Sequence, residues 1–70
     1  MTDGAQTLLT EFDLPFQRKG RLHDITYDAG FHMLRMTFQE RKRFTTIDLD
    51  KQSAAALAQE LFNWAQQQDI

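Results

Sequence analysis

The sequence predicts an α+β fold, in which a four-stranded antiparallel β-meander packs one face on a single C-terminal amphipathic helix. Two observations predict it. Between Phe12 and Leu49, apolar residues recur at every second position in four short segments, which is typical of half-buried strands. After Asp50 the apolar period changes to i, i+3, i+4, i+7, which is typical of a helix.

Length and composition indicate one small globular domain. Seventy residues are near the lower limit for a single hydrophobic core. Hydrophobic residues make up 41% of the chain and charged residues 26%, which separates it from disordered chains. We expect residues 1–10, which lack strand periodicity, to form a mobile N-terminal tail and residues 11–70 to form the domain. The chain has no cysteine, which excludes disulfides, and small chains without such staples often associate.

The sequence also indicates where the protein resides. No apolar run approaches the roughly 20 residues needed to cross a bilayer. The first residues are mixed and slightly acidic, unlike a secretory signal peptide. We therefore expect a soluble cytoplasmic protein of bacterial type with no membrane partner.

The first predicted strand contains Phe12, Leu14 and Phe16, with Pro15 between them. Proline has no N–H to donate, which favours a position at a sheet edge. The segments "LHDITYD", "FHMLRMTFQE" and "FTTIDL" predict the other three strands.

Two-residue turns at Lys19–Gly20, Ala29–Gly30 and Arg41–Lys42 would place the apolar residues of all four strands on one face. A bulge or a longer loop at either of the last two turns would shift the register, because neither Ala29 nor the Arg41–Lys42 pair offers positive φ cheaply. The predicted pairs are Phe16–His23, Leu14–Ile25, Phe12–Tyr27, Ile25–Leu34, His23–Met36, Met36–Ile47 and Leu34–Leu49.

The helix is predicted from "DKQSAAALAQELFNWAQQQ", with Asp50 as its N-cap. Leu57, Leu61 and Trp64 lie on one stripe, which we expect to cover the sheet. Phe62 flanks this stripe. It is either a rim residue at the sheet edge or part of a self-association surface.

Two of the predicted turns are rich in cations, and a meander brings the first and third turns to the same end of the sheet. They are either solvated turns or a binding site for an anion, because clustered like charges repel one another and an anionic partner would relieve this. The basic residues concerned are Arg18, Lys19, Arg21, Arg41, Lys42 and Arg43. The acidic residues predicted at the opposite end are Glu11, Asp13, Asp28, Asp48 and Asp50.

The sheet face opposite the helix is predicted to carry Phe31 and Phe44 together with a charge row, in which Arg35 lies between Asp24 and Asp48. Such a row is typical of a salt-bridged solvent face. Aromatic side chains near cations can alternatively stack on bases.

No residue pattern predicts catalysis. His23 and His32, placed on the core-side face, have no evident third ligand for a metal, and the ten acidic residues show no paired spacing for acid–base work. The three glycines are isolated and form no phosphate-binding loop. We therefore expect a protein that is not an enzyme and that uses no cofactor and no metal.

The order of four strands and one helix, with "TTIDLDKQSAAALAQELFNWAQQ" at the junction, resembles the single-stranded-DNA-binding transcriptional coactivator family over about residues 11 to 68. The resemblance implies dimerisation through the helix region and binding of single strands on a curved sheet. It implies backbone contacts from Arg18, Lys19, Arg21, Arg35, Arg41, Lys42 and Arg43, with Phe31 and Phe44 as stacking groups.

Two functions are consistent with the sequence. The first is a non-enzymatic module that binds an anionic partner, with single-stranded nucleic acid as a candidate, through the basic end of the sheet. The second is a protein-interaction or self-association module, such as a homodimer, that uses a sheet edge and the Phe62 flank. Salt separates them, because phosphate contacts release counterions and weaken steeply as ionic strength rises.

Overall fold

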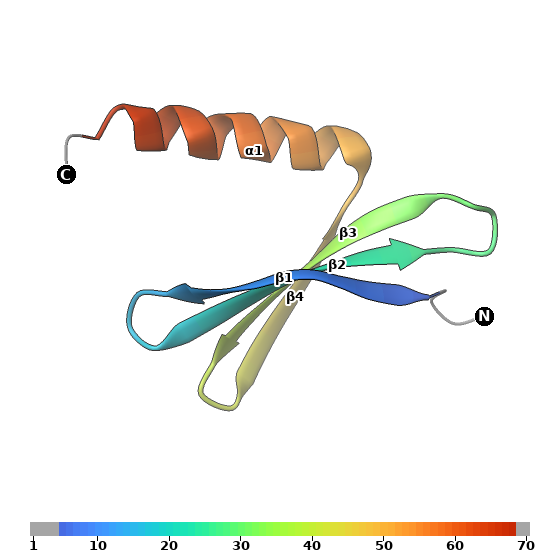
Figure 1. Cartoon of the computed structure of the whole chain (residues 1–70), viewed down its shortest axis with the longest axis horizontal. Coiled ribbons are helices and arrows are strands. Elements are labelled where there is room, and N and C mark those ends of the chain that lie inside the picture. Colours follow the sequence, from blue (N-terminus) through green and yellow to red (C-terminus); the bar gives the residue numbers. More distant parts are fainter. Residues whose placement is uncertain (1–4, 69–70) are drawn as a thin grey trace.

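The computed structural model describes residues 5–68 and shows one antiparallel sheet followed by one helix (Figure 1). The strands are β1 (Gln6–Leu14), β2 (Arg18–Thr26), β3 (His32–Glu40) and β4 (Arg43–Leu49), in the order β1-β2-β3-β4. The helix α1 spans Lys51–Gln66. The predicted α+β layout, with a four-stranded meander before a C-terminal helix, is confirmed.

The first hairpin closes earlier in the chain than predicted. Its turn is formed by residues 15–17, in which Phe16 and Gln17 have φ of 64° and 62°. Leu14 therefore pairs with Arg18, and Phe12 pairs with Gly20. The predicted turn at Lys19–Gly20 is wrong, and so are the pairs Phe16–His23, Leu14–Ile25 and Phe12–Tyr27. Pro15 opens the turn with its fixed φ, which is a common role for proline.

β1 also begins earlier than predicted. Residues 6–10, which we expected to be tail, belong to this strand, and Gln6 and Leu8 pair with Ile25 and His23. Residues 1–4 lie outside the described part of the chain. The register shifts between Leu8 and Thr10, which inserts an extra residue into β1. Such a bulge breaks the two-residue alternation, which explains why the sequence pattern did not reveal this half of the strand.

The second hairpin has a longer loop than the predicted two-residue turn. The Tyr27 N–H donates to the Phe31 carbonyl (2.9 Å), and the Gly30 N–H donates to the Tyr27 carbonyl (2.8 Å). Gly30 has φ of 85°, which suits glycine. The added residue moves the register by one, so the predicted pairs Ile25–Leu34 and His23–Met36 are wrong. Ile25 pairs with Met33 and His23 with Arg35.

The third hairpin has the predicted register. Glu40 pairs with Arg43 across the two-residue turn at Arg41–Lys42, and the pairs Met36–Ile47 and Leu34–Leu49 are confirmed. Arg41 adopts the positive φ (57°) that this tight turn requires.

These registers divide the sheet into an apolar face and a polar face. Ile25 pairs with Met33 on the polar face and is the only fully buried hydrophobic residue in the described part of the chain. His23 lies on the polar face and His32 on the apolar face, so the predicted placement of both on one face is wrong. The apolar face is defined by Phe12, Leu22, Leu34, Met36, Phe38 and Ile47. The polar face carries Glu11, Lys19, Arg21, His23, Arg35 and Asp48.

The helix begins at its predicted cap but does not cover the sheet. The Asp50 carboxylate accepts a hydrogen bond from the Ser53 N–H (2.7 Å). No residue of α1 is buried, and Leu61 and Trp64 are 59% and 66% exposed. The expectation that this stripe covers the sheet therefore fails within the single chain. Among the described residues, no helix is long and apolar enough to cross a bilayer.

Candidate nucleic-acid interface

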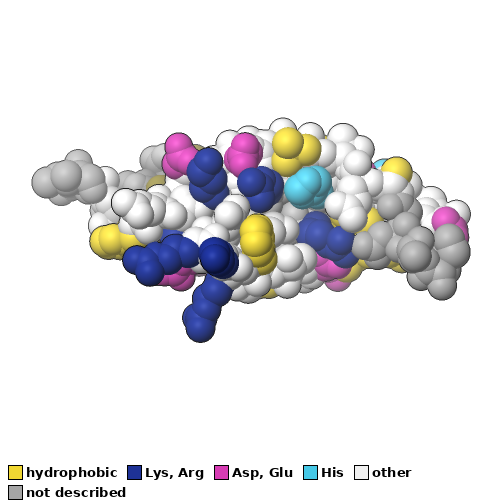
Figure 2. Space-filling view, turned by 90° about the horizontal axis from the view of Figure 1, so that it is seen from below, with side chains coloured by type: hydrophobic (Ala, Val, Ile, Leu, Met, Phe, Trp, Pro, Cys, Tyr) yellow, Lys and Arg dark blue, Asp and Glu magenta, His cyan; other side chains and the backbone are white. Residues whose placement is uncertain are grey.

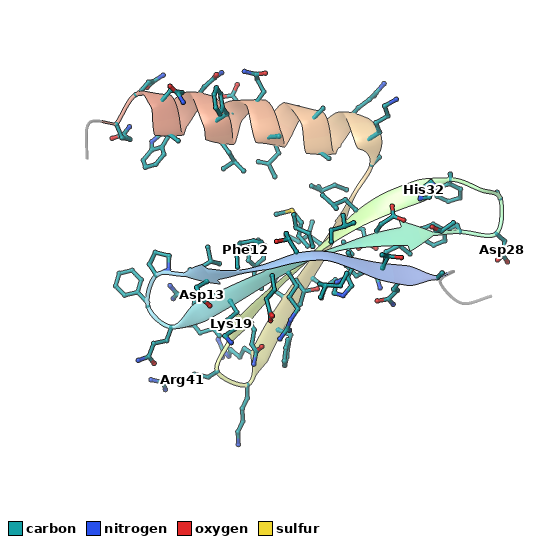
Figure 3. The ribbon with its side chains drawn as sticks, in the orientation of Figure 1. Phe12, Asp13, Lys19, Asp28, His32 and Arg41 are labelled. Carbon is teal, nitrogen blue, oxygen red and sulfur yellow. The ribbon has the colours of Figure 1, made fainter. Side chains whose placement is uncertain are left out.

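The first and third turns lie at the same end of the sheet, as the meander predicted. Arg18 starts β2 and pairs with Glu40, which ends β3 and pairs with Arg43. Figure 3 shows Lys19 and Arg41 at this end. We call it the basic end, and it comprises Arg18, Lys19, Arg21, Arg41, Lys42 and Arg43.

Two acidic residues that were predicted at the opposite end of the sheet lie at the basic end instead. Glu11 pairs with Arg21, and Asp13 pairs with Lys19 (Figure 3). Their predicted position at the opposite end followed from the wrong register of the first hairpin. Asp28 lies at the opposite end, as predicted (Figure 3).

Ion pairs divide the cations of the basic end into two groups. The Arg18 guanidinium lies 3.0 Å from the Glu40 carboxylate, and that of Arg21 lies 2.9 Å from the Glu11 carboxylate. The other four cations form no ion pair with the part of the chain that the structure describes, and all four are exposed. A partner anion can therefore approach these charges without displacing an internal carboxylate. They are Lys19, Arg41, Lys42 and Arg43.

The surface at the third turn is hollowed. An open hollow of about 440 Å³ is lined by Glu40, Arg41, Lys42 and Arg43. A smaller hollow of about 160 Å³ shares Glu40 and Arg43 with it and reaches Arg18. Figure 2 shows Lys and Arg side chains gathered over part of one face of the molecule, some of them projecting from it. Some of the cations thus line the hollows, and others project from the surface.

Two exposed aromatic rings accompany these cations. Phe44 is 59% exposed and lies on the polar face, in a cross-strand row with Gln39, Lys19 and Asp13. Phe16, at the tip of the first hairpin, is 83% exposed, and the Arg18 guanidinium lies 5.7 Å from its ring centroid. The sequence pattern missed Phe16, because its spacing from Leu14 is that of a strand. The preceding proline was the available signal for a turn.

Arg35 lies in the middle of the polar face, away from the turns. Its Nε and a terminal nitrogen donate to the two carboxylate oxygens of Asp48, at 2.8 and 3.0 Å. These hydrogen bonds and the positive charge of Arg35 hold the pKa of Asp48 below its usual value. The predicted charge row is only half correct, because Asp24 lies on the apolar face and His23 is the β2 residue opposite Arg35.

Phe31 lies in the loop between β2 and β3, at the other end of the sheet from the basic end. It stacks on Tyr27, with ring centroids 4.7 Å apart. The structure therefore separates Phe31 from Phe44 by the length of β3.

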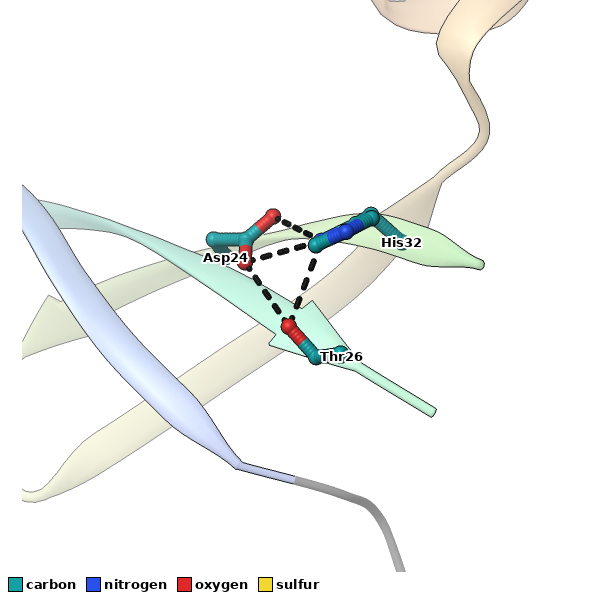
Figure 4. A network of polar contacts seen from close by, with 3 residues as sticks. All are labelled: Asp24, Thr26 and His32. Atoms are coloured by element: carbon teal, nitrogen blue, oxygen red, sulfur yellow. Dashed lines mark hydrogen bonds and ion pairs between the residues drawn. The ribbon is translucent and has the colours of Figure 1, made fainter. Parts of the chain in front are cut away.

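The end of the sheet opposite the basic end carries a group of hydrogen-bonded polar side chains, Asp24, Thr26 and His32, which we call the His32 cluster. The Nδ1 atom of His32 lies 3.0 Å from both carboxylate oxygens of Asp24, and the Thr26 hydroxyl donates to Asp24 at 3.1 Å (Figure 4). A hollow of about 450 Å³ adjoins the cluster and reaches Lys51 and Ala54 of α1. Within residues 5–68, no three His, Cys, Asp or Glu side chains are placed to hold a metal ion together.

The chain belongs to a family of unknown function (DUF6967), whose model matches residues 3–67. Neither a curated protein nor a solved structure matches the chain.

Proposed function

We propose that this protein is a non-enzymatic binding module that holds the phosphate backbone of a single-stranded nucleic acid at its basic end. The observation that carries the proposal is a group of four exposed cations that form no ion pair within residues 5–68, contributed by two hairpins to one end of the sheet. Flexible cations of this kind neutralise phosphates and release counterions, which drives association.

The exposed rings favour a single strand over a duplex. Bases in a duplex are stacked on one another, whereas the bases of a single strand are free to stack on aromatic side chains. Phe44 lies in the same cross-strand row as Lys19. One nucleic-acid strand can therefore stack a base on the Phe44 ring and place a phosphate against the Lys19 ammonium group.

The overall charge of −2 does not prevent this binding. Two carboxylates of the basic end, Glu11 and Glu40, are compensated by Arg21 and Arg18. The third, Asp13, lies opposite Lys19, so six cations share this end with three carboxylates. The nucleic-acid strand therefore meets a local positive potential, which a cluster of like charges can generate on a protein of opposite net charge.

Titration of a fluorescently labelled single-stranded oligonucleotide at low and moderate salt tests the proposal. Anisotropy should report binding that weakens steeply as salt rises. The triple variant Arg41→Gln, Lys42→Gln, Arg43→Gln should abolish it. Binding that is indifferent to salt, or that survives the triple variant, would overturn the proposal.

Two single lysine variants provide a matched comparison. Lys42→Gln removes one exposed charge from the basic end, while Lys51→Gln removes one from the start of α1, beside the His32 cluster. Only the first should weaken binding and reduce the salt dependence. Equal effects would show that the chain binds through its net charge and not at the basic end.

The contributions of the two turns can be distinguished with Lys19→Gln. This variant removes the one cation of the first hairpin that has no ion pair with any described residue. If both hairpins hold one strand, this variant should weaken binding as Lys42→Gln does. A silent Lys19→Gln would restrict the site to the third turn.

A further inference from the structure

The helix and the apolar face present two uncovered apolar surfaces to each other. Ala54 is the only half-buried residue of α1, and it lines the hollow at the start of the helix with Leu34 and Leu49. Its side of the helix is therefore turned toward the sheet there. Figure 1 shows the helix continuing beside the sheet from this single junction. The helical period places on the same side a surface that we call the apolar stripe, made of Ala54, Leu57, Ala58, Leu61, Trp64 and Ala65.

Both surfaces are accessible in the single chain. Of the apolar stripe, Leu57, Leu61 and Trp64 are 40%, 59% and 66% exposed. On the apolar face, Ile47 is 47% exposed, and Met36 and the other large side chains are only half-buried.

The dimensions of the chain show how much surface is left uncovered. Its accessible surface is 5975 Å², whereas a compact monomer of 8.2 kDa exposes about 4,500 Å². Its radius of gyration is 14.0 Å, against about 11 Å for a compact domain of this length. The chain thus exposes an excess of about 1,400 Å². This area is within the range that each partner buries in a permanent homodimer, about 1,000–2,500 Å².

We propose that a second copy of this chain covers both surfaces, so that the apolar stripes and apolar faces of two copies form one shared core. A symmetric pair satisfies both surfaces at once, because each copy carries the stripe and the face. The apolar stripe has no charged residue, and α1 as a whole has only Lys51 and Glu60. The apolar stripe therefore lacks the charge pattern by which a foreign partner would be selected. Its three alanines allow close approach, and its leucines and tryptophan supply the buried area.

Sedimentation equilibrium of the full chain, without nucleic acid, tests this proposal independently of the proposed function. We expect a dimer mass and a melting midpoint that rises with protein concentration, because dissociation accompanies unfolding. Trp64 is the only tryptophan in the chain, so its emission reports the stripe directly. On association it should shift to shorter wavelength. A monomer mass at every concentration, with emission typical of exposed tryptophan and a constant midpoint, would overturn the proposal.

Two matched glutamate variants locate the interface. Leu61→Glu places a carboxylate on the apolar stripe, and Gln59→Glu places the same group on another side of α1. We expect Leu61→Glu to be monomeric at concentrations where Gln59→Glu and the wild type are dimeric. A dimer that persists in Leu61→Glu would place the interface elsewhere and overturn the proposal. If Leu61→Glu fails to fold, the wild-type mass, emission and concentration dependence still decide between the outcomes.

Discussion

The ring of Phe12 lies directly over the backbone of Gly20, its partner across the first hairpin. A Cβ atom added to Gly20 would be 2.4 Å from two of the ring carbons. The Phe12 ring occupies the space that a side chain at position 20 would need, and Gly20 is buried. A glycine within a strand has no side chain to pack, and the ring compensates for this by covering the Gly20 backbone.

Replacement of Gly20 by alanine should therefore destabilise the protein by about 1–3 kcal/mol, because the methyl group forces the Phe12 ring aside. Urea unfolding at one fixed protein concentration measures the change. The same substitution in a Phe12→Leu background should cost less, since the smaller side chain can move. An equal cost in both backgrounds would show that the contact with Phe12 is not the cause.

The sequence predicted the third hairpin correctly and the first incorrectly, for a physical reason that lies in their turns. The third turn has two residues, so strand alternation continues in register on both sides of Arg41 and Lys42. In the first hairpin, Pro15 begins a turn within a segment whose apolar spacing is that of a strand. The bulge near Leu8 likewise interrupts the two-residue alternation, so the sequence pattern did not reveal the first part of β1.

The sequence predicted which turns lie together but not which charges remain available. Chain connectivity alone brings the two cationic hairpins of a meander to one end of the sheet. Whether Arg21 is neutralised depends on which residue faces it, and Glu11 faces it only in the observed register. The exposure of the apolar stripe was also beyond the sequence pattern, because periodicity identifies an apolar stripe without identifying what covers it.

The ion pair between Arg35 and Asp48 should make stability depend on acid pH. Because the folded-state pKa of Asp48 lies below the unfolded value of about 3.8, this carboxylate stabilises the folded state above pH 3.8. The stabilisation is lost as the pH falls through the folded-state pKa. Denaturant unfolding between pH 6 and pH 2 should show a weaker pH dependence for Asp48→Asn than for the wild type. Arg35→Met should show a similar reduction, and an unchanged profile in both variants would contradict the assignment.

The cap formed by Asp50 should control the start of α1. Its carboxylate accepts the Ser53 N–H, which lowers the pKa of Asp50 and satisfies a donor at the helix N-terminus. Asp50→Ala should reduce helicity in far-UV circular dichroism and speed amide exchange at Ser53. Asp50→Asn should preserve both, because an amide oxygen can accept the same hydrogen bond. Equal losses in the two variants would indicate that the charge, not the cap, holds the first turn.

The first turn can be tested by the sign of a stability change at Gln17. Its φ of 62° lies in the left-handed region, which costs a residue with a side chain roughly 1–2 kcal/mol and costs glycine almost nothing. Gln17→Gly should therefore stabilise the protein, by up to about 1 kcal/mol after the greater entropy of glycine in the unfolded chain is offset. Gln17→Ala is the control, because alanine removes the same polar group without gaining access to positive φ. In the register predicted from sequence, Gln17 would lie within a strand, where glycine destabilises by about 0.5–1 kcal/mol. Urea midpoints of the two variants, measured at equal protein concentration, thus distinguish a turn at residues 15–17 from a turn at Lys19–Gly20. A midpoint for Gln17→Gly below that of Gln17→Ala would contradict the observed hairpin.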